Sequence, residues 1–332
     1  MLAALMLILL AGGMNGSFAV PMKRVRAWQW EHTWLVWSLL GMFVIPLAIS
    51  VATVPDLGAV YRAAGLQPLA LTALYGMIWG AGTVLFGLGI TRVGLALSFG
   101  IVIGTSSSLG TIIPLVMLHR DRLFTAAGLL MLAGVGVILG GVAAGAWAGL
   151  LREATARERR DGSFMVGLII CLLSGLGSSF MSLALNESTP ISRAAENLGA
   201  APAVSLNAVW PVLLGGGLVV NAVYCVFLLV RRGNAARFQE FTWANIGLVV
   251  VMAALWSGSN FVYSAGARGM CSLGLILGWP IFMAVIVLTA NAWGLLMGEW
   301  RGAGRQAITW AATGCLLLVV GIWIIALAGN RS

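Results

Sequence analysis

Two aromatic side chains and one amide side chain follow one another at helical spacing in the second half of the chain. Trp256, Asn260 and Tyr263 stand at positions i, i+4 and i+7, so one face of a helix would carry all three. Tryptophan and tyrosine offer flat apolar rings with a polar edge, and asparagine both donates and accepts hydrogen bonds. A sugar has matching apolar C–H faces and a ring of hydroxyl groups. This face predicts contact with a sugar, and packing between helices is the alternative.

Polar and aromatic side chains in other apolar segments form a larger group of candidates. Polar groups are costly in lipid, so they tend to face a bundle interior or a water-filled cavity. The competing interpretation is again helix packing, because small hydroxyl residues often allow close contact between membrane helices. The candidate substrate-binding residues are Asn15, Trp79, Thr83, Ser178, Ser182, Asn186, Trp256, Asn260, Tyr263 and Trp279.

The titratable residues predict neither an enzyme nor a metal centre. A hydrolase needs a nucleophile beside a base, and a metalloenzyme needs clustered ligands. The two histidines lie far apart, and the four cysteines stand singly in apolar runs. We therefore expect no catalytic residue, no bound metal and no cofactor. Seven titratable residues are expected at the ends of apolar segments, where water solvates them: Glu31, His32, His119, Asp121, Glu187, Glu196 and Glu299.

The composition defines the elements that must position these residues. The 332 residues are 60% hydrophobic and only 9% charged, whereas soluble domains carry about 25% charged residues. Lipid must therefore be the main solvent. A span needs about 20 apolar residues, and segments of that length predict an all-α polytopic membrane protein. The ten predicted spans are 1–20, 34–54, 69–91, 94–118, 123–150, 164–186, 205–230, 244–267, 270–297 and 306–328.

The basic residues predict how these spans are oriented. Lys23 and Arg24 follow the first apolar run instead of preceding it, which indicates a retained span and not a cleaved signal peptide. Thirteen of the 19 lysine and arginine residues fall in the loops on one side, and the positive-inside rule places that side in the cytoplasm. Both termini are then outside. The net charge of +9 reflects this topology, so nucleic acid is not an expected partner.

Two weak internal matches divide the chain into halves. The triplet at 16–18 matches that at 178–180, and residues 78–89 align without gaps on 255–266, which pairs Trp79 with Trp256. We predict a five-helix repeat at 1–151, a basic cytoplasmic linker at 152–163 and a second repeat at 164–332. A repeat of five helices must insert with inverted topology. Inverted repeats are typical of alternating-access transporters with a site near the membrane midplane.

Five stretches carry a resemblance to a known family: "PMKRVRAWQWE" (Pro21–Glu31), "MIWGAG" (Met77–Gly82), "RAAENLGAAP" (Arg193–Pro202), "LGGGLVVNAVYC" (Leu214–Cys225) and "GEWRGAG" (Gly298–Gly304). With these, the chain resembles the L-rhamnose–proton symporter family, within the drug/metabolite transporter superfamily, essentially end to end. The resemblance implies uptake of a deoxyhexose such as L-rhamnose across a bacterial inner membrane, driven by a cation gradient, normally protons.

The residues leave the coupling ion and the transported molecule open. Glu31 and Glu299, inside matched motifs, and Lys23 are the residues that the resemblance implies for coupling. Sodium is the alternative coupling ion. A transporter or exporter of another polar metabolite on the same fold is the alternative function. The residues leave the oligomeric state open.

Overall fold

The computed structural model describes residues 2–93, 95–153, 162–270, 274–298 and 300–329. Within these ranges the chain is almost entirely helical, and no strand occurs in them. The longer elements are α1 (Leu2–Ser17), α2 (Trp30–Leu39), α3 (Ile45–Thr53), α5 (Leu66–Val93), α6 (Leu95–Leu118), α7 (Ala126–Glu153), α8 (Gly162–Glu187), α10 (Trp210–Arg232), α11 (Thr242–Arg268), α12 (Gly274–Leu296) and α13 (Arg305–Gly329). The shorter ones are η1 (Pro21–Arg24), η2 (Leu40–Val44), α4 (Leu57–Ala64), η3 (Arg120–Arg122), α9 (Thr189–Asn197), η4 (Ser205–Ala208) and η5 (Ala235–Gln239).

Ten spans in the described ranges are long and apolar enough to cross a bilayer, which confirms the predicted ten-helix fold class. The second span differs from the prediction in its start and its internal structure: it begins at Trp30, not at residue 34, and consists of α2, η2 and α3. Element η2 is a π-helical turn, in which the amide of Ile45 donates to the carbonyl of Leu40. The next residue, Pro46, has no amide hydrogen, so it cannot make the regular helical bond to Met42.

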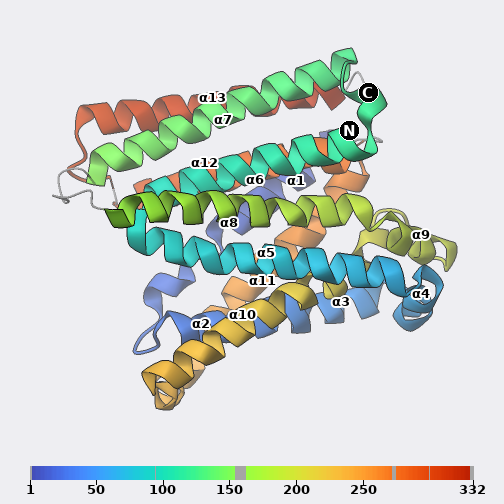
Figure 1. The fold of residues 1–332 in the computed structure, drawn as a ribbon, viewed down its shortest axis with the longest axis horizontal. Coiled ribbons are helices and arrows are strands. Elements are labelled where there is room, and N and C mark those ends of the chain that lie inside the picture. The colour runs from blue at the N-terminus through green and yellow to red at the C-terminus, as the bar shows by residue number, and fades with distance from the viewer. Residues whose placement is uncertain (1, 94, 154–161, 271–273, 299, 330–332) are drawn as a thin grey trace.

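The spans form layers (Figure 1). Helices α7 and α13 lie along one flank, and α2, α3 and α10 lie along the opposite flank. The other long helices lie between these flanks. Within this middle part α1 packs against α11 and α12, while α8 packs against α5 and α6. The hydrophobic core therefore runs through the centre of the bundle.

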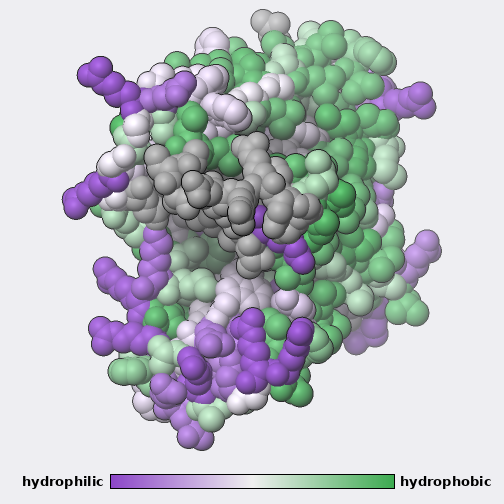
Figure 2. Space-filling view, turned by 60° about the vertical axis from the view of Figure 1, so that its left-hand side comes forward, coloured by the Kyte–Doolittle hydropathy of each residue, from purple (hydrophilic) through white to green (hydrophobic). Residues whose placement is uncertain are grey.

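The two ends of the bundle differ in charge. One end carries the connections at 18–29 and 233–241, and we call it the basic end, because Arg24, Arg26 and Arg231 are exposed there. Figure 2 shows hydrophilic side chains gathered at this end, beside a flank that is mainly hydrophobic. Both chain termini lie at the opposite end, together with α4 and α9 (Figure 1).

The sequence patterns predict neither α4 nor α9, which pack against each other at the opposite end. The hydroxyl of Tyr61 in α4 donates to the carbonyl of Ala208 at 3.0 Å. Burial raises the pKa of Tyr61, so this hydroxyl keeps its proton at physiological pH. The contact ties α4 to the segment that begins α10.

Glycines allow the backbones of α5 and α10 to approach each other closely. A Cβ atom on Gly76 would overlap the carbonyl oxygen of Leu213, and one on Gly216 would overlap that of Ala73. A Cβ on Gly217 would lie 2.6 Å from the Trp79 ring. Only glycine therefore allows α10 to approach α5 at this distance and hold the Trp79 side chain in place.

Candidate substrate path and coupling site

The centre of the candidate site is a pair of stacked tryptophans. Trp79 of α5 and Trp256 of α11, which the internal repeat aligns, have ring centroids 5.8 Å apart and an interplanar angle of 20°. Each side chain is only 7% exposed. One turn further along, Thr83 lies 3.0 Å from the Asn221 side-chain oxygen, and Asn260 is buried. The two predicted faces thus meet through their tryptophans, whereas Tyr263 packs against Trp279 and Phe282 of α12.

A row of aromatic rings, which the sequence analysis missed, connects this pair to the basic end. Trp30, Trp34 and Trp37 of α2 follow one another, with ring centroids 5.1 Å and then 4.4 Å apart. Trp37 meets Trp256 edge to face at 4.8 Å. The spacing of i, i+4 and i+7 in α2 is the same signal that singled out α11. The predicted span began at residue 34, so this face was cut short.

Several buried polar atoms near these rings have no hydrogen-bond partner in the structure. They include Trp37 Nε1 and Ser38 Oγ on α2, and Ser257 Oγ and Asn260 Nδ2 on α11. The four side chains are at most 2% exposed. An unpaired buried polar group costs about 1–3 kcal/mol, so native proteins retain such groups rarely and often for function. Two helices that pack together therefore offer donors that a ligand could use.

Most of the remaining predicted residues use their polar groups within the protein. Asn15 donates to Ser259 Oγ at 2.9 Å, which links α1 to α11. Ser178 is half-buried on α8. The other donors act on backbone carbonyls: Ser182 on Gly110 at 2.6 Å, Asn186 on Ser182 at 2.9 Å, Tyr263 on Leu275 at 3.0 Å and Trp279 on Ser106 at 3.3 Å.

The expectation that water solvates Glu31 and His32 at the membrane interface is wrong. Both side chains have no exposed surface. Glu31 accepts from Arg232 at 2.9 Å and from the Asn234 amide at 2.6 Å. His32 Nε2 lies 3.0 Å from the Asn234 carbonyl, and its ring meets Phe238 edge to face. The segment after α10 covers both residues, and a pattern local to the first loop could not reveal that cover.

The same contacts close the basic end between the two halves of the chain. The Asn245 side chain accepts from the Arg26 amide at 3.1 Å and donates to the Arg26 carbonyl at 2.8 Å. Arg237 donates to the carbonyl of Ala27 at 3.2 Å. Glu31 and Arg232 are therefore part of a wider clasp that holds residues 26–32 against residues 232–245.

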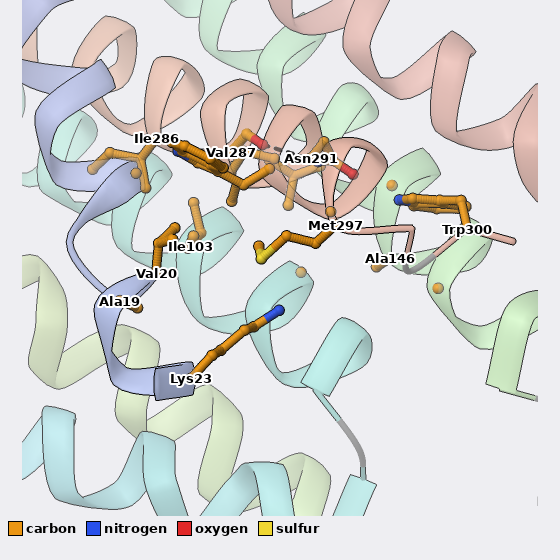
Figure 3. A pocket seen from close by; sticks show the side chains of 18 residues that line it. Ala19, Val20, Lys23, Ile103, Ala146, Ile286, Val287, Asn291, Met297 and Trp300 are labelled. Carbon is orange, nitrogen blue, oxygen red and sulfur yellow. Dashed lines mark hydrogen bonds between the residues drawn. The ribbon is translucent and has the colours of Figure 1, made fainter. Parts of the chain in front are cut away.

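The other two coupling candidates lie elsewhere. Lys23 is exposed and lines a cavity of about 240 Å³ between α1, η1, α6, α7 and α12. Figure 3 shows its side chain extending from η1 across this space toward the facing helices. None of the ten candidate substrate-binding residues lines it. Glu299 lies outside the described residues. Within the described ranges, no group of three or more histidine, cysteine, aspartate or glutamate side chains could hold a metal ion.

The chain has ten apolar spans in its described residues, aromatic and polar groups in its interior, and a charged clasp at one end. Together these features define a multi-pass membrane transporter. The family model described as L-rhamnose-proton symport protein (RhaT) matches residues 1–330. The chain belongs to this family, which is one of symporters and not of enzymes.

Relatives and one solved structure agree with that assignment. The chain is 29% identical to an L-rhamnose-proton symporter of Escherichia coli O1:K1 / APEC over 328 residues, which cover 96% of this chain and 95% of that protein. It is 30% identical to the same-named protein of Salmonella dublin, with the same coverage. A solved structure described as "Crystal structure of protein" matches with a TM-score of 0.60 at 16% identity, covering 99% of this chain and 98% of the other. That likeness concerns the fold alone.

Proposed function

We propose that this protein takes up L-rhamnose, or a closely related deoxyhexose, together with protons across the bacterial inner membrane. Its family and the names of its curated relatives support this activity. The observation that carries the proposal is the stacked Trp79–Trp256 pair beside the unpaired Asn260 amide. Flat rings and a free hydrogen-bond donor suit a ligand with apolar C–H faces and hydroxyl groups.

The proposed sugar site combines two kinds of contact. The rings of Trp79, Trp256 and Trp37 cover the apolar faces of the sugar. Ser257 and Asn260, with Trp37 Nε1 and Ser38 on α2, pair with its hydroxyl groups. We propose that the remaining candidates contribute to the sugar path on either side of this centre: Asn15, Thr83, Ser178, Ser182, Asn186, Tyr263 and Trp279.

Alternating access between inverted repeats is the proposed transport mechanism. The packing supports it, because most of the close helix pairs remain pairs when each helix is exchanged with its partner five spans along the chain. Helix α1 packs on α11 and α12, and its partner α8 packs on α5 and α6. Helices α7 and α13, which are partners, pack on each other, as do α2 and α10. An axis that relates the halves would pass between Trp79 and Trp256.

We further propose Glu31 as the acid that carries the coupled proton. A buried carboxylate inside a span is costly unless it is paired, and such groups often belong to proton pathways. Protonation would neutralise Glu31 and weaken its ion pair with Arg232. Helix α2 would then be freed at the basic end, and this helix also carries Trp37. His32, buried next to Glu31, is the neighbouring titratable group.

The basic end is proposed to face the cytoplasm, as the positive-inside rule predicts. Both termini would then lie on the periplasmic side, because they share the opposite end with α4 and α9. In this orientation the clasp between residues 26–32 and 232–245 closes the cytoplasmic exit.

A binding panel tests the proposed cargo. Purified protein is heated with L-rhamnose, other hexoses, amino acids or nucleosides, and the apparent melting temperature is recorded. A ligand at 100 times its dissociation constant stabilises by about 2.7 kcal/mol. We expect the largest shift with L-rhamnose, and a smaller shift with L-rhamnose in the Asn260→Leu variant. A larger shift with an amino acid or a nucleoside would assign the protein to another polar metabolite.

A further inference from the structure

Two neighbouring cavities form an apolar slot that the sugar site does not use. A second cavity, of about 370 Å³, lies between α6, α7 and α8. It shares Gly100, Val142 and Ala146 with the cavity beside Lys23. The two spaces therefore adjoin along α6 and α7. The lining of both is mainly small and aliphatic.

One end of this slot reaches the lipid-facing surface. Trp147 and Leu172 line the second cavity and are 49% and 52% exposed. Leu172 belongs to a row on α8 that also contains Met165, Ile169 and Leu176, all of them exposed. This spacing puts the four side chains on one helical face. In a membrane-spanning helix, such a face contacts acyl chains.

The other end of the slot carries a positive charge at the basic end. Among the described residues that line the first cavity, Lys23 is the only charged one, and its ammonium group extends over the space (Figure 3). Arg24 and Arg26, on the same connection, are exposed. Basic residues next to a span attract anionic lipid headgroups, and long lysine side chains reach readily to the interface.

We propose that this slot binds an anionic phospholipid, with one acyl chain between α6, α7 and α8 and the phosphate beside Lys23. A sugar fits the slot poorly. The amide nitrogen of Asn291 already donates to the carbonyl of Val287, and most of the lining offers no hydrogen bonds. The proposal is independent of the sugar site, because the ten candidate residues line neither cavity.

Two substitutions separate the charge from the slot. Lys23→Gln removes the charge. Gly145→Leu fills the first cavity, where a Cβ atom on Gly145 would meet no atom within 4 Å. Gly136→Leu is the matched control, since it places the same side chain on α7 in open space away from both cavities.

The experiment measures lipid retention on the delipidated, purified protein by native mass spectrometry, with phosphatidylglycerol or phosphatidylcholine added. We expect the wild type and Gly136→Leu to prefer phosphatidylglycerol. Lys23→Gln should reduce that preference about fivefold, and Gly145→Leu should reduce retention of both lipids. Equal retention of the two lipids by the wild type would overturn the proposal.

Sugar uptake by the same variants tests two alternatives to lipid binding: that the first cavity belongs to the sugar path, and that Lys23 is a coupling residue. If Gly145→Leu abolished L-rhamnose uptake with unchanged lipid retention, the cavity would belong to the sugar path. If Lys23→Gln abolished proton-driven uptake with unchanged retention, Lys23 would be a coupling residue. Either result would contradict lipid binding. Because Lys23 is exposed, its substitution keeps the test valid even if Gly145→Leu folds poorly.

Discussion

At the scale of single residues, the candidate sugar site is distinguished from ordinary helix packing by its unpaired buried polar groups. In lipid an unpaired donor is costly, so Asn260 and Ser257 mark a place where a ligand is expected. Asn15 and Ser182, which are also buried, already have partners within the protein. Side chains with similar sequence patterns therefore have different roles, and the hydrogen bonds distinguish them.

Asn260→Leu should weaken sugar binding and leave the fold intact. Leucine has a similar volume but leaves the sugar hydroxyl unpaired, which costs about 1–3 kcal/mol, or roughly 5- to 150-fold in dissociation constant. Titration calorimetry with L-rhamnose measures the change. Asn291→Leu is the control, because its amide bonds to a carbonyl of its own helix. Equal affinity in Asn260→Leu and the wild type would exclude Asn260 from the site.

Glu31→Gln should separate sugar movement from the proton gradient. The neutral amide imitates a permanently protonated carboxyl group, so exchange of labelled sugar across the liposome membrane should persist. Proton-driven accumulation should fall at least tenfold. Glu240→Gln, at an exposed acid near the same end, is the control and should accumulate sugar normally. Normal accumulation by Glu31→Gln would move the coupling role to another acid.

The burial of Glu31 could not have been predicted from its own neighbourhood. Its partners Arg232 and Asn234 lie about 200 positions away in the chain, and hydropathy reports nothing about such contacts. Trp37 was within reach of prediction, because Trp30, Trp34 and Trp37 repeat the spacing already noticed around Trp256. The second span was predicted to begin at residue 34, so Trp30 lay outside it and the pattern was incomplete.

At the scale of elements, composition predicted the ten spans well, since spanning length and apolar content are local properties. The short helices α4 and α9 were missed because each lies between spans and mixes polar with apolar residues. The π-helical turn η2 was also missed. It combines a proline two positions beyond the turn with packing against α11, and the second factor is not local.

Close packing of α5 against α10 makes a prediction at this scale. Gly216→Ala should lower the apparent melting temperature by about 5 °C, because the added methyl group overlaps the Ala73 carbonyl. The neighbouring Gly215→Ala is the matched control, since a Cβ atom there meets no atom within 4 Å. Thermal unfolding in detergent compares the two. If both variants melted like the wild type, this glycine contact would not limit helix approach.

At the scale of the whole molecule, we propose that the two halves of the chain act as an inverted pair. The interface between α2–α3 and α10 is fastened at both ends, by Glu31 with Arg232 at the basic end and by Asn207 with Thr53 at the opposite end. Helices α7 and α13 form the other flank. We infer that α7 and α13 form the frame, and that the flank of α2, α3 and α10 moves when the pair of Glu31 and Arg232 opens at the basic end.

The orientation of this frame is directly testable. Alkaline phosphatase fused to the C-terminus should be active, because we place that terminus in the periplasm. A fusion in the connection at 233–241 should be inactive, because that loop belongs to the basic end. The reverse pattern would invert the topology and make the clasp around Glu31 a periplasmic gate.

The central claim is proton-coupled transport of a deoxyhexose, and uptake into proteoliposomes tests it most directly. Labelled L-rhamnose is offered with an inward proton gradient, with an inward sodium gradient and with neither. We expect L-rhamnose to accumulate above its external concentration with the proton gradient alone, and a protonophore to abolish this accumulation. Accumulation driven by sodium, or no accumulation under any gradient, would contradict it.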